Sequence, residues 1–351
     1  MRAIAATAVV LTHLPHVAND VIGDRTLGIP DLLSFGYAGV DLFFVVSGFI
    51  IAHITASTAF ELRAFLSRRF VRIVPLYWLY TLVFVAMAVA SGHDEPLLAS
   101  LPESLAMVPQ RDFPTLPVGW SLEHELVFYV IAAGTLMCGG SLLHALVVAS
   151  LGAIALHVIA RGADEAIWDF HLLSLYHVEF SVGVLVHRCR RALSPRAAHA
   201  MLLVGVALFV ATSDIVLHER LPGVATQTVN EGWLGLVRVL GFGAGGGAIV
   251  LGLLRIEMHG RLARWPRATA FGCRVGDASY SIYLSHLLVF KVLGKAYAAV
   301  GVPASLVWPA LGFAVVVALL VGFASYAWVE RPLLAAMTAR RASVDTAGSQ
   351  R

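Results

Sequence analysis

Long apolar runs alternate with short polar segments along almost the whole chain. Ten of these runs approach the length of about 20 residues with which an α-helix crosses a bilayer. They lack the period-2 alternation of membrane β-strands, so the pattern predicts an all-α polytopic membrane protein. We expect about ten transmembrane helices, over roughly 3–18, 36–56, 71–91, 122–138, 142–160, 171–187, 199–214, 234–254, 280–298 and 304–328.

Composition strengthens this prediction and removes other classes of protein. Hydrophobic residues fill 58% of the 351 positions and charged residues only 13%, whereas soluble domains average roughly 45–50% and 25%. The net charge of +3 comes without a basic arm or zinc-type spacing, so we expect no nucleic-acid partner and no metal. The three cysteines lie far apart and predict no disulfide framework.

The distribution of arginine predicts the orientation in the membrane. Arginine gathers in four alternate segments, which are 57–72, 188–198, 255–279 and 330–351. The intervening segments hold one arginine each and are rich in acidic residues, so the arginine-rich side is predicted to be cytoplasmic. Both termini are then cytoplasmic, which requires an even number of helices in the plasma (inner) membrane. We expect one integral-membrane domain over 1–335 and a short polar cytoplasmic tail, disordered, over 336–351.

The first apolar run contains two ionisable residues, Arg2 and His13. Their separation is about three helical turns, so both side chains share one face and lie roughly 16 Å apart along the axis. Arg2 is then at the cytoplasmic mouth and His13 in the outer half of the bilayer, where ionisable groups tend to line pathways. Two plainer explanations stay open, a positive-inside anchor and a histidine satisfied within the bundle. His16, one turn further on, is a rival for any role of His13.

Charged residues also mark the starts of the next helices. Asp41 opens the second helix from the outer side, where the helix dipole favours a carboxylate. A basic cluster at the cytoplasmic start of the third helix is either a lipid-headgroup anchor or a clamp for phosphate groups. This basic cluster consists of Arg68, Arg69 and Arg72. Glu125 lies in "WSLEHELVFY", at the outer end of the fourth helix.

Six stretches, taken in order, resemble acyltransferase family 3, the integral-membrane acyltransferases that modify bacterial surface and secreted polysaccharides. They are "RAIAATAVVLTH", "GVDLFFVVSGF", "RRFVRIVP", "WSLEHELVFY", "SYSIYLSH" and "VERP". The resemblance runs from Arg2 to about Leu333 and implies transfer of an acyl group, usually acetyl, from cytosolic coenzyme A to a carbohydrate hydroxyl. "WSLEHELVFY" is most similar to the branch that acts on exopolysaccharides such as succinoglycan.

The resemblance also implies roles for individual residues. Arg2 and His13 match the paired essential residues of the first helix. Arg68 and Arg69 match the basic pair that is associated with the acyl donor. Glu125, and not Glu123, matches the glutamate of the pattern Trp-Ser-Leu-x-x-Glu. Together these roles imply a membrane-bound enzyme that transfers acyl groups other than amino-acyl groups, with O-acetyl transfer the expected reaction.

These implications lead to a hypothesis for the mechanism. The nucleotide of acyl-coenzyme A rests on Arg2 and the basic cluster, while the pantetheine arm brings the thioester toward His13. His13 then either acts as general base on a sugar hydroxyl that arrives from outside or carries the acyl group covalently. Asp41 and Glu125, both expected at the outer end, orient the acceptor or the imidazole.

The expected partners are a polysaccharide or lipid-linked glycan acceptor, the lipid bilayer and proteins of polysaccharide assembly. The competing hypothesis is a transporter or flippase for a glycan or a lipid-linked precursor. Transporters often show inverted repeats and paired broken helices, and the sequence has neither pattern. Binding of coenzyme A would separate the two hypotheses, because a flippase has no need of it.

Overall fold

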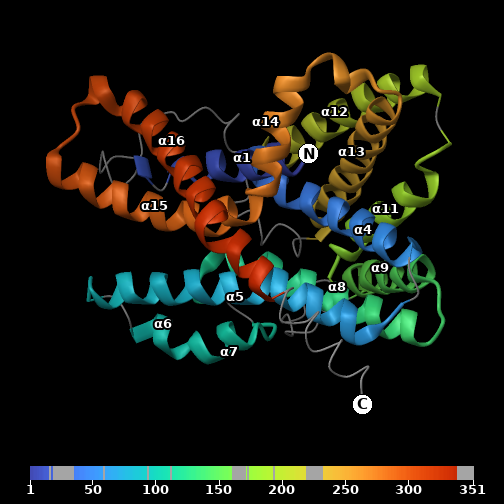
Figure 1. Cartoon of the computed structure of the whole chain (residues 1–351), viewed down its shortest axis with the longest axis horizontal. Coiled ribbons are helices and arrows are strands. Elements are labelled where there is room, and N and C mark those ends of the chain that lie inside the picture. The colour runs from blue at the N-terminus through green and yellow to red at the C-terminus, as the bar shows by residue number, and fades with distance from the viewer. Residues whose placement is uncertain are drawn as a thin grey trace.

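The computed structural model describes residues 1–15, 17–18, 35–57, 60–92, 95–110, 113–159, 171, 174–192, 194–218 and 232–337. Over these residues the fold consists of helices and connecting turns, without a β-strand (Figure 1). The predicted all-α fold is therefore confirmed for the described part of the chain.

The first half of the chain supplies the helices that surround the N-terminus. They are α1 (Arg2–Thr12), η1 (Phe35–Ala38), α4 (Gly39–Ser57), α5 (Leu62–Val89), α6 (Glu95–Ala99), α7 (Leu101–Ala106), η2 (Pro117–Gly119), α8 (Trp120–Met137) and α9 (Leu142–Ile159).

The second half forms two long helical pairs and their connections. Its elements are α11 (His177–Cys189), α12 (Pro195–His218), α13 (Gly232–Met258), η4 (Arg261–Arg264), α14 (Pro266–Asp277), α15 (Ser279–Val300), η5 (Ala304–Leu306), α16 (Val307–Ser325) and the π-helical turn η6 (Tyr326–Glu330).

Several helices can cross a membrane. Within the described residues, five stretches are long and apolar enough to do so by length and composition. They are Phe35–Ala56, Leu62–Val89, Pro195–Val216, Gly235–Met258 and Val307–Met337. Arg2–Thr12 and Leu142–Leu156 are shorter apolar helices. These helices support a membrane protein, while the count of ten and the location of the termini stay predictions.

Two predicted helices differ from the structure. The first, expected over 3–18, is interrupted: α1 ends at Thr12 with His13 as its cap, and Leu14, Pro15, Val17 and Ala18 are helical again. Pro15 explains the interruption, because proline lacks the N–H that would bond the carbonyl group four residues earlier. The third helix begins at Leu62 and not near 71, so the basic cluster lies inside α5. Arginine is a good helix former, and nothing in this segment stops the helix before it.

Helix α1 lies in the middle of the fold. It contacts α4, α14, α15 and α16. Figure 1 shows α1 and α4 between the α15–α16 pair at one end and the α12–α13 pair at the other. Residues from both halves of the chain therefore meet around the N-terminal helix.

Helices α4 and α11 cross at two glycines. A Cβ on Gly48 would overlap the carbonyl oxygen of Phe180, and a Cβ on Gly183 would overlap that of Val45. Small residues at such crossings let two membrane helices approach backbone to backbone. Gly48 and Gly183 therefore form a packing seam between α4 and α11.

A buried ion pair joins α4 to α13. The Nε and Nη2 atoms of Arg238 donate to the two carboxylate oxygens of Asp41 at 3.2 and 3.0 Å, and both side chains are at most 1% exposed. The guanidinium also lies over the rings of Tyr37 and Tyr176, with Cζ 5.1 and 5.6 Å from their centres. The pair links the first turn of α4 to a helix almost 200 residues away in sequence.

We predict that Gly183→Val destabilises the protein. The new side chain cannot fit against α4, and overpacking of this kind costs about 1–3 kcal/mol. The matched control is Gly152→Val, because a Cβ at Gly152 meets nothing within 4 Å. Thermal unfolding in detergent should show a lower midpoint for Gly183→Val than for the control, and equal midpoints would contradict the close crossing.

We also predict that Arg238→Ala is strongly destabilising, because it leaves the carboxylate of Asp41 buried without its cation. Breaking one side of a buried pair costs about 3–5 kcal/mol. The double variant Asp41→Ala/Arg238→Ala should lose less than the sum of the two single variants in the same unfolding assay. Additive losses would mean that the two residues do not stabilise each other.

Candidate active site

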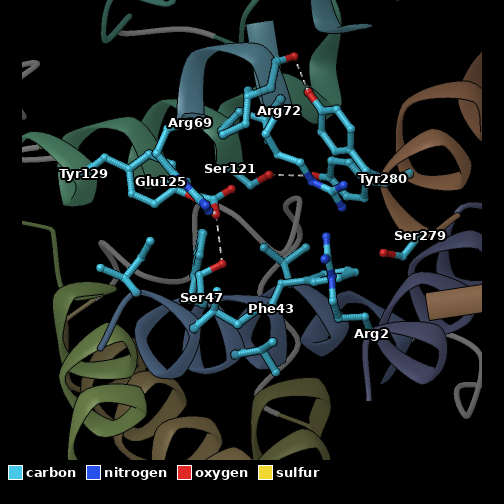
Figure 2. Close-up of a pocket in the computed structure, with 18 residues that line it drawn as sticks. Arg2, Phe43, Ser47, Arg69, Arg72, Ser121, Glu125, Tyr129, Ser279 and Tyr280 are labelled. Carbon is cyan, nitrogen blue, oxygen red and sulfur yellow. Dashed lines mark hydrogen bonds between the residues drawn. The ribbon is translucent and has the colours of Figure 1, made fainter. Parts of the chain in front are cut away.

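A cavity opens among five helices, α1, α4, α5, α8 and α15 (Figure 2). The cavity has a volume of about 110 Å³, counted as the space that the centre of a water molecule can reach. By this measure a single water molecule needs roughly 10–15 Å³. The wall contains apolar side chains such as Phe43, Ile50 and Leu122. Its polar side chains are Arg2, Ser47, Arg69, Arg72, Ser121, Glu125, Tyr129, Ser279, Tyr280 and Tyr283. The cavity can therefore hold a slender ligand that has both charged and apolar parts.

Three arginines from two helices reach this cavity. Arg2 extends from α1 toward Arg72 of α5, and Arg69 lies one turn before Arg72 on the same face of α5 (Figure 2). Arg72 also forms an ion pair with Glu330 at 3.2 Å. Arg68 is exposed and does not line the cavity, because it points about 100° away from Arg69 on the helix. The basic cluster is therefore split, and only two of its members face the cavity.

Two polar atoms of the cavity residues are buried without a hydrogen-bond partner among the described residues. They are Nε of Arg69 and the hydroxyl oxygen of Ser279. The guanidinium of Arg69 lies 5.7 Å from the ring centre of Tyr129. Buried polar atoms are nearly always hydrogen-bonded in proteins, so such groups on a cavity wall favour a bound polar ligand or ordered water.

Glu125 lines this cavity, whereas Asp41, expected to act beside it, pairs with Arg238 instead. Glu125 accepts hydrogen bonds from the hydroxyl of Ser47 at 2.9 Å and from the hydroxyl of Tyr129. Glu123, two residues earlier on α8, points away and interacts with His171 at 2.9 Å and Gln110 at 3.1 Å. Two residues along a helix differ by about 200° in direction, so only one of the two glutamates can face the cavity.

His13 lies outside the lining of the cavity, where α1 ends. It is half-buried, and its Nδ1 donates to the carbonyl oxygen of Val9 at 2.7 Å. The same nitrogen is 3.3 Å from Nε2 of His286 on α15. The ring of His286 lies 6.1 Å from the ring of Tyr283, which lines the cavity. Helix α15 thus leads from the arginines to the histidine pair.

The remaining predicted site residues lie elsewhere. Asp41 forms the ion pair with Arg238 and is not part of the cavity wall. His16 lies outside the described residues. Among the residues that the structure describes, no group of three or more histidines, cysteines or carboxylates is arranged to hold a metal.

Three residues of this region were not among the predicted site residues. Ser47 donates a hydrogen bond to Glu125. Glu330, at the end of "WVERP", accepts a hydrogen bond from Ser281 at 2.6 Å and pairs with Arg72. Tyr129 follows Glu125 by four residues, a spacing that places two side chains on one helical face and could have indicated the contact.

Comparison with known proteins agrees with the resemblance seen in the sequence. A family model described as an acyltransferase domain matches residues 1–327. The chain is 35% identical over 329 residues to the exopolysaccharide production protein ExoZ of Rhizobium meliloti (strain 1021), covering 90% of this chain and 95% of that protein. No solved structure matches the chain. The family model spans nearly the whole chain and includes the helices around the cavity. This protein therefore belongs to the acyltransferase family and is a membrane acyltransferase.

Proposed function

We propose that the protein moves an acyl group, acetyl in the simplest case, from cytosolic acyl-coenzyme A to a hydroxyl of an exported polysaccharide. The observation that carries this proposal is a cavity with three arginines that helix α15 connects to a histidine. Family membership supports acyl transfer, and the similar protein ExoZ, named for exopolysaccharide production, supports the acceptor class. Neither comparison favours the transporter hypothesis.

The arginines suit the nucleotide end of the donor. Coenzyme A carries phosphate groups at that end, and guanidinium groups bind phosphate through paired, charge-assisted hydrogen bonds. Arg2 and Arg69 face the cavity together with Arg72. The pantetheine arm then follows the wall formed by Tyr280 and Tyr283 and presents the thioester near His13. This placement keeps Arg69 and Arg72 of the predicted donor site and leaves out Arg68.

His13 performs the chemistry in this proposal. Its unprotonated nitrogen takes the proton of the acceptor hydroxyl while the oxygen attacks the thioester carbonyl carbon. The carbon–sulfur bond then breaks, and the departing thiolate takes the proton from the imidazolium. The products are an ester and free coenzyme A, so protons and charge balance. In the covalent alternative the same nitrogen first accepts the acyl group and the hydroxyl removes it in a second step.

Glu125 supports the donor site and does not take part in the acyl transfer itself. It lies among the donor arginines and is held by Ser47 and Tyr129. A carboxylate at this position keeps the guanidinium groups apart and oriented when no donor is bound. Asp41 has no part in the proposed reaction and stabilises the fold through Arg238.

We predict that Arg69→Gln weakens acetyl-coenzyme A binding by about ten- to a hundredfold, because a lost charge-assisted contact costs roughly 1.5–3 kcal/mol. The measurement is binding of acetyl-coenzyme A to the detergent-solubilised protein. Arg68→Gln is the matched control, since it removes an exposed arginine from the same helix. Equal affinities for the two variants would reject the assignment of Arg69 to the donor site.

We predict that His13→Ala lowers acyl transfer by about 10²- to 10⁴-fold, the usual contribution of a general base. Acetyl-coenzyme A binding should persist, because the arginines of the cavity remain. The measurement is the acyl content of the exported polysaccharide from cells that hold each variant at matched levels, together with donor binding. Wild-type acylation by His13→Ala would remove this residue from the mechanism.

A further inference from the structure

Helix α15 brings a second histidine against His13. His286 is fully buried, and the two rings meet edge to face with their centres 4.9 Å apart and their planes at 61°. The Nε2 atom of His286 lies 3.3 Å from Nδ1 of His13. The two residues are 273 positions apart in sequence, so the contact exists only because α1 packs on α15.

Carbonyl groups orient both rings. Nδ1 of His13 is 2.7 Å from the carbonyl oxygen of Val9, and Nδ1 of His286 is 2.7 Å from that of Tyr283. A carbonyl oxygen only accepts hydrogen bonds, so each Nδ1 carries a hydrogen and donates it. A neutral His286 then has its lone pair at Nε2, which faces the N–H of His13.

The other tautomer of His286, which carries its hydrogen on Nε2, is unfavourable. A hydrogen on Nε2 of His286 would leave the lone pair of its Nδ1 against the carbonyl oxygen of Tyr283. If that hydrogen were donated to His13, the lone pair of His13 Nδ1 would also lie 2.7 Å from the carbonyl oxygen of Val9. Only one pair of tautomers therefore places a donor against an acceptor at all three contacts.

We propose that His286 is the positioning residue that holds His13 in its reactive tautomer. It accepts the Nδ1–H of His13 together with the Val9 carbonyl and so keeps the lone pair of His13 at Nε2. This inference rests on the proposed function, in which that lone pair takes the proton of the acceptor hydroxyl. When His13 becomes an imidazolium, its Nδ1–H is a stronger donor, and the contact with His286 stabilises the charge.

The surroundings of His286 hold its ring in place. The ring of Phe290 meets it edge to face at 6.0 Å and 89°. Tyr283, one turn earlier, donates its hydroxyl hydrogen to the carbonyl oxygen of Val118 at 2.8 Å and lies 2.8 Å from the hydroxyl of Ser121. Helix α15 is thereby anchored beside α8, and His286 meets His13 at a defined angle. A fully buried imidazole of this kind acts through its neighbour and does not contact the acceptor itself.

The test compares His286→Leu with His286→Gln in membranes from polysaccharide-producing cells, with initial rates measured at increasing acetyl-coenzyme A. We expect His286→Leu to lower kcat about 10- to 100-fold, the range observed when the hydrogen-bond partner behind a functional histidine is lost. KM for acetyl-coenzyme A should change less than about twofold, since the arginines are untouched. His286→Gln should recover part of kcat, because its side-chain oxygen can accept the Nδ1–H of His13.

His124→Leu is the control for removing a buried helical imidazole. His124 is 1% exposed, and its Nδ1 donates to the carbonyl oxygen of Trp120 four residues earlier at 3.0 Å. Rates are compared per folded molecule, so a loss of folded protein in either leucine variant does not lower the measured kcat. Wild-type kcat in His286→Leu, equal kcat in the leucine and glutamine variants, or a change in KM alone would overturn the inference.

His13→Ala separates this inference from the proposed function. If His13→Ala is inactive and His286→Leu is fully active, the positioning role is wrong and the proposed reaction stands. If wild-type membranes transfer no acetyl group from acetyl-coenzyme A, or if His13→Ala is fully active, the proposed function itself is wrong.

Discussion

Charged side chains inside an apolar helical bundle need partners, and this constraint determines much of the structure. An unpaired charge costs several kcal/mol away from water, so each buried ion draws the helix that supplies its partner into contact. Asp41 brings α13 to α4 through Arg238, and Glu330 brings the end of α16 to α5 through Arg72. Helices α4 and α5, one from each of these pairs, also line the cavity.

The cavity differs from the rest of the interior in its excess of cationic groups. Three guanidinium groups share its wall with a single carboxylate, that of Glu125. Such an excess favours an anionic ligand. The apolar side chains of the wall suit an uncharged part of the same ligand.

Helix α15 connects the cavity with its arginines to the pair of His13 and His286. Tyr280 donates to the carbonyl oxygen of Ile73 on α5 at 2.7 Å, Tyr283 donates to that of Val118, and His286 contacts His13. Three polar residues at three-residue intervals thus tie α15 to three different elements. Because these contacts involve backbone groups or a second imidazole, they fix the helix without placing another charge in the bilayer.

The sequence by itself determined that the chain is helical and suited to a membrane, which charged residues interrupt its apolar runs, and which family it resembles. Long apolar runs are required for spanning helices, and buried ionisable residues are rare enough to identify from composition alone. Only the tertiary structure decided that Arg69 faces the cavity while Arg68 does not, that Asp41 pairs with Arg238, and that His286 meets His13. The helical period sets the angle between neighbouring side chains, about 100° per residue, but the direction of the whole helix depends on the helices that pack around it.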